Sequence, residues 1–328
     1  MKEIMHKLKV HLFKIWEEKP KADQKVAETD ITVPEAPPRT AKRERKPGRC
    51  AGQILSNVML VIFVAVFCFS GYQIIKNTKQ AGKRDELYTD LSNVAVKPVD
   101  KKPETQKPSV DNGETETSGG TETTEETAQS GTNNATGLQI PETSPISVDF
   151  DLLIEKNSDV MAWVYCPDTP VNYPVVRGTD NDYYLNRLLD GTVNKSGSIF
   201  ADCRNRVDFT DPHTIIYGHN MKDLSMFGSV NKYAKQAYYD QHPVWYINTP
   251  EKNYAVVLLA GYVTDPYAEI YAFKGTPEEP QEILQNALQR SAFKTKATVQ
   301  EGDHLVTFST CYGSSRRFVL IGALREIG

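Results

Sequence analysis

The sequence predicts a mainly β fold: an eight-stranded β-barrel with a few short helices, preceded by one transmembrane helix. Three observations support this fold class. The first is an uncharged apolar run, residues 54–75, and the second is a polar stretch, 109–137, dominated by Thr, Glu, Gly, Ser and Asn. The third is the pattern of residues 146–328, where short β-type runs alternate with turn residues. The length of 328 residues suggests two globular domains, but this uneven distribution leaves one.

Residues 1–50 form a basic leader, which we expect to be cytoplasmic. Its 13 Lys and Arg residues against 8 Asp and Glu residues give a local charge of +5. The first 16 residues place apolar side chains at helical spacing with lysines between them, which is typical of a basic amphipathic helix on an anionic membrane surface. A solvated helix or a disordered tail fits the same residues equally well, so both interpretations stay open.

Residues 51–76 contain the predicted transmembrane helix. The 22 residues from Ile54 to Ile75 carry no charge, and at 1.5 Å per residue they reach about 33 Å, enough to cross a hydrocarbon core of about 30 Å. A buried core helix would show a polar face, and a signal peptide has an apolar region of only about 7–15 residues. Five Lys and Arg residues precede the run and four follow it, so the positive-inside rule favours a cytoplasmic N-terminus only mildly.

Residues 77–145 are expected to form a disordered tether, which would be extracellular if the N-terminus is cytoplasmic. No aromatic residue occurs between Tyr88 and Phe150, and residues 109–137 carry six acidic side chains and no basic one. Such a composition cannot bury a core. About 50 flexible residues would have a root-mean-square reach of about 40 Å, which would hold a folded domain away from a membrane.

Residues 146–328 are expected to form the folded domain. Eight runs rich in Val, Ile, Tyr, Phe and Thr, bounded by turn residues, predict its strands. They are Met161–Cys166, Asn172–Arg177, Ser198–Ala201, Thr214–Tyr217, Val244–Asn248, Tyr254–Val263, His304–Thr310 and Arg317–Leu324. Two segments have helical spacing instead, Phe150–Asn157 and Pro280–Arg290. Many short strands with few helices indicate a closed or nearly closed β-barrel.

Composition and spacing argue against several classes of function. A net charge of −4 disfavours bulk nucleic-acid binding, and 5 cysteines are too few for a disulfide scaffold. The cysteines and histidines of the folded domain show no metal-ligand spacing, and no phosphate-binding loop, dinucleotide fingerprint or serine-hydrolase elbow occurs. We therefore predict no metal site and no cofactor, which leaves Cys–His nucleophilic chemistry as the main option.

Cys311, His219 and an arginine pair are the candidate catalytic residues. Cys311 ends a strand-like run, HLVTFSTC, and Arg316 and Arg317 follow it after a turn signal. A guanidinium beside a thiol stabilises a thiolate or a developing oxyanion. His219 follows another strand in TIIYGHN, and a histidine can donate a proton to a leaving amine near neutral pH. Taken singly, a cysteine at a strand end is more often a small buried side chain, and a histidine there more often a loop residue.

Together these motifs resemble the sortases, the cysteine transpeptidases of Gram-positive cell surfaces. TFSTC at 307–311 is similar to the sortase TLxTC motif, with Phe308 in place of the usual Leu, and YGHN at 217–220 is similar to the sortase histidine loop. The likeness is greatest to class B sortases and covers most of residues 150–328, through NYPVVRGTDNDYYL, KSGSIFADCRN and RRFVLIGAL. A helix before the seventh strand is a class B feature, and Pro280–Arg290 is the candidate for it.

The resemblance implies an activity and roles for particular residues. Cys311 would attack the carbonyl after the Thr of a C-terminal sorting signal and form a thioacyl-enzyme. His219 would protonate the leaving amine and then deprotonate the incoming one. Arg317 would bind the substrate backbone or the oxyanion, and it is preferred to Arg316 because the family's Arg directly precedes the last apolar strand. Three further residues would lie at the substrate groove: Asn181, Leu185 and Ser309.

The resemblance also implies partners and a location. The partners would be surface proteins or pilins bearing a C-terminal sorting signal, with a peptidoglycan precursor or a pilin lysine as the amine acceptor, and the membrane rather than nucleic acid. Because sortases work outside the cell, the chain would cross the cell membrane once, with a cytoplasmic N-terminus and an extracellular catalytic domain. The sequence does not choose between cell-wall anchoring and pilin polymerisation. A non-enzymatic, tethered surface-binding β-barrel, with Cys311 as a core residue, is the alternative hypothesis.

Two features depart from the family pattern. Five residues lie between Cys311 and Arg317, which is a shorter loop than in some class B relatives. Phe308 needs more room than Leu, although on a strand it faces away from the side of Cys311. Cys166 and Cys203 are expected to be buried thiols, and no disulfide is predicted between them.

Overall fold

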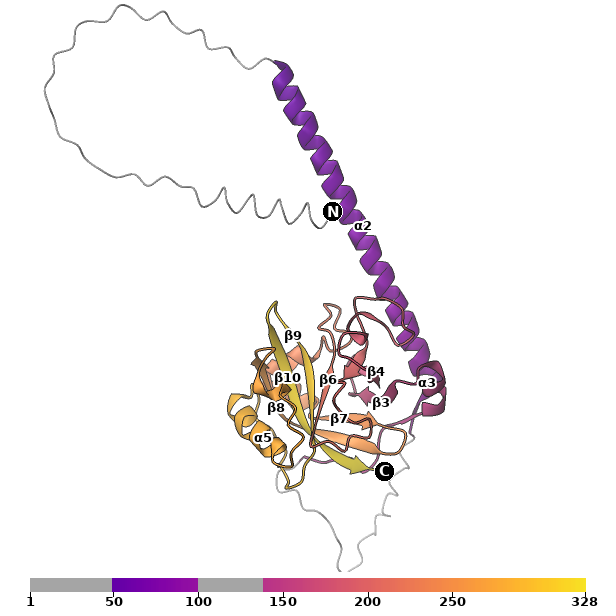
Figure 1. Ribbon diagram of the computed structural model, residues 1–328, viewed down its shortest axis with the longest axis vertical. Helices are drawn as coiled ribbons and strands as arrows, with labels where there is room; N and C mark the ends of the chain where they lie inside the picture. Colours follow the sequence, from indigo (N-terminus) through magenta and orange to yellow (C-terminus); the bar gives the residue numbers. More distant parts are fainter. Residues whose placement is uncertain (1–48, 100–137) are drawn as a thin grey trace, which may run out of the picture. The chain divides into compact units, whose positions relative to one another are not determined.

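The computed structural model describes residues 49–99 and 138–328 (Figure 1). The chain divides into two compact units, Met1–Val64 and Ala65–Gly328, and the division falls within one long helix. Residues 1–48 of the predicted leader and residues 100–137 of the predicted tether lie outside the described residues.

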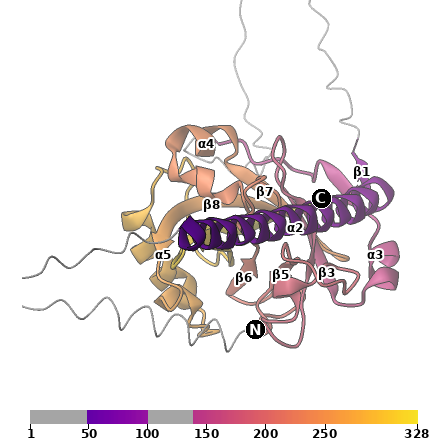
Figure 2. The same cartoon turned by 90° about the horizontal axis from the view of Figure 1, so that it is seen from above.

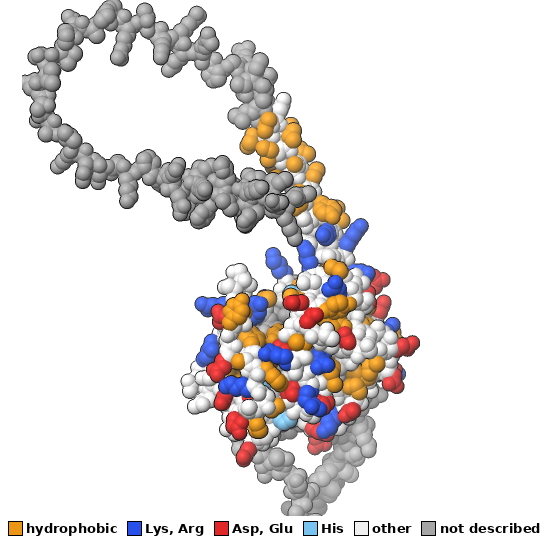
Figure 3. Space-filling model, viewed as in Figure 1, with side chains coloured by type: hydrophobic (Ala, Val, Ile, Leu, Met, Phe, Trp, Pro, Cys, Tyr) orange, Lys and Arg blue, Asp and Glu red, His pale blue; other side chains and the backbone are white. Residues whose placement is uncertain are grey.

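Helix α2 (Arg49–Ala95) contains the predicted transmembrane segment and continues well beyond it. By length and composition it could cross a membrane, and its most apolar stretch is uncovered (Figure 3). Large apolar side chains are exposed along most of this helix from Val58 to Ile75. Soluble monomers rarely expose contiguous apolar patches of this extent. The helix is therefore compatible with a single-pass membrane anchor.

The C-terminal part of α2 packs on the β domain, which corrects the prediction of a disordered tether for residues 77–99. Tyr88, Leu91 and Ala95 are buried in the same core cluster as barrel residues. Their spacing puts them on one helix face, and burial of this apolar stripe explains why the segment is ordered as helix. The chain then forms β1 (Val96–Pro98), which pairs antiparallel with β2 (Ile146–Val148). Figure 2 shows β1 and α3 beside this end of α2.

Eight strands form a closed barrel in the order β10-β8-β7-β3-β4-β5-β6-β9, which confirms the predicted fold class. The pairs β4–β5 and β6–β9 are parallel, and the other pairs are antiparallel. Each predicted strand is present, with ends shifted by at most 3 residues. Their bounds are β3 (Val160–Tyr165), β4 (Asn172–Val176), β5 (Ile199–Ala201), β6 (His213–Tyr217), β7 (Val244–Asn248), β8 (Asn253–Thr264), β9 (Leu305–Tyr312) and β10 (Arg316–Ile327).

Both predicted helices of the folded domain are present, together with short ones that the sequence did not predict. The predicted pair are α3 (Phe150–Lys156), whose first turn is capped by the Asp149 side chain, and α5 (Glu279–Arg290), which precedes β9. The additional elements are α4 (Gln236–Gln241) and three 3₁₀ turns, η1 (Tyr184–Asn186), η2 (Val230–Ala234) and η3 (Glu269–Tyr271).

The core has two parts, one on each face of β9 and β10. Inside the barrel, Phe308 packs against Phe227 and Trp245, with ring centroids 5.7 and 4.4 Å apart. Phe308 is fully buried there, which confirms that it faces away from the side of Cys311. The outer face is covered by α5, whose Leu284 and Ala287 belong to a second cluster with residues of β8, β9 and β10.

Candidate active site

Strand register brings His219 and Cys311 to the same end of the barrel. β6 and β9 are parallel neighbours, and Tyr217 at the end of β6 is the Cα partner of Ser309. Beyond the last pair, the Gly218 amide still donates to the Ser309 carbonyl over 3.1 Å. Two residues further along each strand are His219 and Cys311, so the parallel pairing places them side by side.

The register of the β9–β10 hairpin places only one of the two candidate arginines on the face of Cys311. Arg317 is the direct partner of Cys311, whereas Arg316 is the partner of Tyr312. Since partners across a strand pair project to the same face and neighbours along a strand to opposite faces, Arg317 shares the face of Cys311 and Arg316 does not. The structure therefore supports the choice of Arg317.

The electrostatics of the site favour an ionised thiol beside a protonated imidazole. Hydrogen bonding with His219 and the charge of Arg317 lower the pKa of the Cys311 thiol, although burial opposes this. The same hydrogen bond raises the pKa of His219, against the effect of burial and of Arg317. The thiolate, not the thiol, is the nucleophile, so a lowered pKa increases the fraction of Cys311 in its reactive form at a given pH.

Backbone contacts fix the orientation of both residues. The His219 Nε2 donates to the Leu185 carbonyl over 2.7 Å, which leaves Nδ1 for the thiol. The Cys311 carbonyl accepts hydrogen bonds from the Asn220 and Asn231 side-chain amides, at 2.9 and 3.1 Å. Because these two amides come from the segment that follows His219, they tie the cysteine strand to the histidine loop.

All six residues predicted for the site line one pocket. It has a volume of about 250 Å³ and is bounded by Cys311, His219, Arg317, Asn181, Leu185 and Ser309, together with Phe200, Tyr217, Gly218, Pro266, Tyr271 and Thr310. The Ser309 hydroxyl is hydrogen-bonded to the Tyr271 hydroxyl over 2.8 Å. The Leu185 side chain is 37% exposed, so it offers an apolar surface at the mouth of the pocket rather than in the core.

A buried carboxylate, Asp202, joins several walls of the pocket. It is 1% exposed and accepts hydrogen bonds from the Tyr217 hydroxyl (2.9 Å), the Asn181 amide (3.1 Å) and the Arg204 guanidinium (2.7 and 2.8 Å). Arg204 also donates to the Tyr271 carbonyl over 3.1 Å. Asn181 is thus held in place, since its side-chain oxygen also accepts the Cys203 amide.

Sequence reasoning missed Asp202, Tyr217, Tyr271 and the two asparagines that hold Cys311. Tyr217 and Asn220 lie in the YGHN motif itself, so the motif carried a signal for them. Tyr271 belongs to the long connection between β8 and β9, and nothing in the local sequence indicates that it meets Ser309.

The other cysteines have different surroundings. Among the described residues, Cys68, Cys166, Cys203 and Cys311 are free. Cys166 is buried as expected, and burial raises its pKa to about 12, whereas Cys203 is half-buried rather than buried. Within residues 49–99 and 138–328, no group of three His, Cys, Asp or Glu side chains could hold a metal ion.

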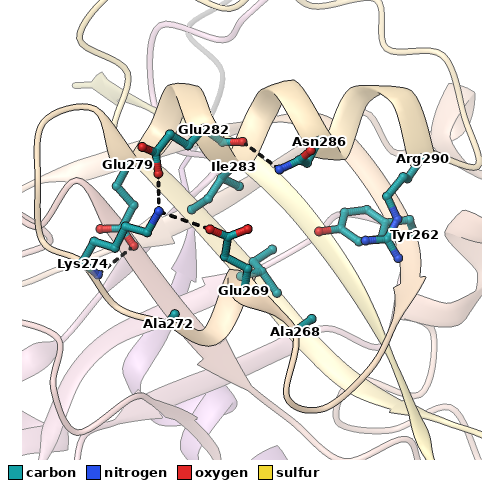
Figure 4. Close-up of a pocket in the computed structure, with 11 residues that line it drawn as sticks. Tyr262, Ala268, Glu269, Ala272, Lys274, Glu279, Glu282, Ile283, Asn286 and Arg290 are labelled. Carbon is teal, nitrogen blue, oxygen red and sulfur yellow. Dashed lines mark hydrogen bonds and ion pairs between the residues drawn. The ribbon is translucent and has the colours of Figure 1, made fainter.

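A second pocket of about 280 Å³ lies between α5 and the segment around η3 (Figure 4). Its charged groups are bonded to one another: Lys274 pairs with Glu269 and Glu282, and Glu279 accepts the backbone amides of Lys274 and Gly275. Glu279 also lies 3.6 Å from His213 of β6. These contacts support the connection that delivers Tyr271 to the first pocket.

No family model matches the chain, but its relatives among known proteins share one name, Sortase B. The chain is 38% identical over 161 residues to Sortase B of Listeria monocytogenes, an alignment that covers 48% of the chain and 65% of the relative, just under two thirds. It is 28% identical over 185 residues to Sortase B of Staphylococcus aureus, covering 54% and 75%.

Solved structures show the same fold. A sortase B–substrate complex from S. aureus matches with a TM-score of 0.52 and 27% identity. The match covers 55% of the present chain and 85% of the S. aureus chain. A Bacillus anthracis protein described as similar to sortase B matches with a TM-score of 0.51 and 36% identity, covering 55% and 83%.

Proposed function

The chain belongs to the class B sortases, a family of cysteine transpeptidases, and from this premise we propose that it cleaves a C-terminal sorting signal and transfers the freed acyl group to an amine. One observation carries the proposal: Cys311 lies directly opposite Arg317 on β9–β10, and His219 lines the same pocket. Nucleophile, proton carrier and cation thus meet in one open pocket.

In the first half of the reaction, the Cys311 thiolate attacks the carbonyl carbon after the Thr of the sorting signal. Arg317 stabilises the charge that develops on the carbonyl oxygen, because a fixed cation in a partly desolvated pocket acts strongly on such a charge. The C–N bond then breaks, and the His219 imidazolium gives its proton to the leaving amine. A thioacyl-enzyme remains, with His219 neutral.

In the second half, an incoming amine attacks the thioester carbon. The neutral His219 takes a proton from this amine, and the Cys311 thiolate leaves as the new amide forms. Thiolate and imidazolium are restored, so the cycle needs no external acid, base or cofactor. A water molecule in place of the amine would give hydrolysis instead.

The proposed partners follow from this chemistry. The donor is a surface protein or pilin with a C-terminal sorting signal, and the acceptor is the amine of a peptidoglycan precursor or of a pilin lysine. A similar sortase B has been solved in complex with triglycine, which supports a peptide amine as the acceptor class. We place the chain in the cell membrane with its N-terminus cytoplasmic and the barrel outside.

The test uses the full chain in detergent micelles with a panel of fluorescence-quenched sorting-signal peptides and amine acceptors. We expect at least one peptide to be cleaved and joined to an amine. Cys311→Ala and His219→Ala should abolish both steps, whereas Cys68→Ala, which removes a thiol on α2, should leave them unchanged. Retained cleavage in Cys311→Ala would refute the proposal and favour a non-enzymatic binding barrel.

A further inference from the structure

The last turns of α2 contact two different segments that hold His219 in place. The first is the loop that follows His219, residues 220–228. The second is the segment 194–198, which lies behind the Leu185 carbonyl that accepts the His219 Nε2 proton. The helix that carries the apolar anchor segment is therefore also in contact with the surroundings of the proposed proton carrier.

Arg84 makes the contact with the histidine loop. Its side chain is 3% exposed, and its Nη2 lies 2.8 Å from the Asp223 carboxylate. The same guanidinium donates to the Ser196 hydroxyl over 3.2 Å and to its neighbour Asp85. A fork of this kind can hold two chain segments at once, since a guanidinium donates in fixed directions.

The histidine loop needs such support because its backbone is constrained. Leu224 and Met226 adopt positive φ angles of 67° and 53°, a region that costs free energy for residues with side chains. Asp223 shapes the turn by accepting the Ser225 amide over 3.1 Å, and the Phe227 amide closes the loop on the His219 carbonyl over 3.0 Å. Asp223 is thus the point at which Arg84 can act on the position of His219.

The second contact is with the segment behind Leu185. The Asn194 side-chain amide donates to the Gln80 backbone carbonyl over 2.7 Å, and the Tyr88 hydroxyl donates to the Ser198 hydroxyl over 3.1 Å. Between these two points lies Gly197, where an added Cβ would come within 2.6 Å of the Leu185 carbonyl oxygen. Backbone of this segment therefore presses against the group that orients the His219 ring.

Tyr88 adds a third connection. Its ring packs edge-to-face on Tyr173 with centroids 5.3 Å apart, and the Tyr173 hydroxyl accepts the Met226 amide over 3.1 Å. Contacts from Arg84, Gln80 and Tyr88 of α2 thus reach the loop or the segment next to the carbonyl that positions His219.

We propose that Arg84, in the last turns of α2, is a positioning residue for His219, although it touches no reacting atom. The inference rests on the proposed function, since it assigns a support to the proton carrier of that reaction. It predicts that loss of the Arg84–Asp223 pair lets the histidine loop relax, so that His219 leaves its alignment with Cys311.

The experiment uses the full chain in detergent micelles and compares Arg84→Gln with Lys83→Gln, which removes the same charge from the neighbouring exposed position. With a peptide that the unaltered chain processes, Arg84→Gln should lose about 10- to 100-fold in kcat with little change in KM, the range expected for slight misplacement of a catalytic group. Lys83→Gln should match the unaltered chain. Arg84→Lys should recover part of the rate.

A second readout needs no peptide. Alkylation of Cys311 by iodoacetamide, followed by mass spectrometry across a pH series, reports how well His219 stabilises the thiolate. In Arg84→Gln its midpoint should move to higher pH, toward the ordinary thiol value of about 8.5. Asp223→Asn keeps the oxygen that accepts the Ser225 amide and should shift the alkylation midpoint in the same direction. If Arg84→Gln does not fold, the Asp223→Asn variant tests the inference in its place.

Each outcome bears on the inference. Unchanged kcat and an unchanged alkylation midpoint in both variants would overturn it. A lower rate with an unchanged midpoint would also overturn it, because the helix would then support the fold without acting on His219. If the unaltered chain processes no peptide while the midpoint still shifts in Arg84→Gln, the proposed function fails and the positioning role is supported.

Discussion

Replacing Asp202 by Asn tests whether one buried carboxylate holds the substrate pocket together. The substitution keeps the shape and volume of the side chain but removes its charge and turns one acceptor oxygen into a donor. In the structure both oxygens accept: one faces Arg204, and the other faces Arg204, Tyr217 and Asn181. An amide cannot satisfy this set, because its nitrogen must point at other donors.

The expected loss can be worked out from these bonds. A hydrogen bond to a charged group contributes about 1.5–3 kcal/mol, and a buried donor left without a partner costs about 1–3 kcal/mol. Because the Arg204 side chain is 45% exposed, solvent screens its hydrogen bonds with Asp202, and their contribution to the free energy of unfolding lies at the low end of the range for charged groups. We therefore expect Asp202→Asn to lower the free energy of unfolding by about 2–4 kcal/mol. KM should rise more than kcat falls, since Asp202 supports Asn181 and Tyr217 but lines no part of the pocket itself.

The assay is urea unfolding of the full chain in micelles at pH 7, followed by tryptophan fluorescence, because Trp163 and Trp245 are buried in the barrel. Burial opposes ionisation of Asp202, but its hydrogen bonds with Arg204 and Tyr217 outweigh this and lower its pKa. Its contribution is complete above the ordinary value of 3.8 and is lost as pH falls through the lower folded-state pKa, so pH 7 measures all of it.

Asp208→Asn is the matched control for Asp202→Asn. Asp208 also pairs with an arginine two residues away, Arg206, but its side chain is 37% exposed and that of Arg206 is 67% exposed. An exposed pair contributes less than about 1 kcal/mol. If Asp202→Asn destabilises the barrel no more than Asp208→Asn does, the carboxylate does not organise the pocket and the reasoning is refuted.

Two further predictions concern the arginines and the thiols. Arg317→Ala should lower kcat/KM by about 100-fold or more, as expected for a lost oxyanion donor, while Arg316→Ala stays within about twofold; equal losses in a peptide-cleavage assay would contradict the register argument. Cys311, with His219 and Arg317 facing it, should be alkylated with a midpoint below about 8.5, because a lowered pKa leaves more thiolate at a given pH. Cys166, whose pKa is raised to about 12 by burial, should stay unmodified until the barrel unfolds. An alkylation midpoint for Cys311 as high as that of a free thiol would show that the site does not activate Cys311.

The strands and the Cys–His pair could be predicted because their signals are local. Each strand is a short run of β-branched and aromatic residues between turn residues, and Cys311 and His219 stand where such runs end. The choice between Arg316 and Arg317 could not be made from the pattern of β10, whose two faces are both apolar. The structure gives the reason: Phe318 faces the barrel interior, whereas Val319 lies in the cluster under α5.

Contacts between distant segments could not be predicted. Asp202 contacts residues of the pocket because the barrel closes, and Tyr271 reaches the pocket on the long connection between β8 and β9. No local sequence pattern indicates either contact. The continuation of α2 was missed for a different reason. Its buried stripe has a few apolar residues, Tyr88, Leu91 and Ala95, among exposed charged ones, and this signal is weak beside the neighbouring low-complexity stretch.

The candidate active site is the uncovered end of a sheet face whose other end is covered by α5. On the outer face, register lines up Ser309 with Tyr217 on one side and with Val319 on the other. Val319 is covered by the cluster of α5, and two residues beyond Ser309 the same face presents Cys311 opposite Arg317. The packed part of this face therefore determines where the reactive part lies.

Core packing also protects the register that pairs Cys311 with Arg317. A slip of β10 by one residue would bring Arg316 or Phe318 opposite Cys311 and turn every side chain of the strand to the other face. Phe318 and Leu320 would leave the barrel interior, at a cost of about 1.5–3 kcal/mol for each buried side chain that becomes exposed. Alternatives that place the wrong arginine beside the thiol are thereby disfavoured by the core itself, at a distance from any reacting atom.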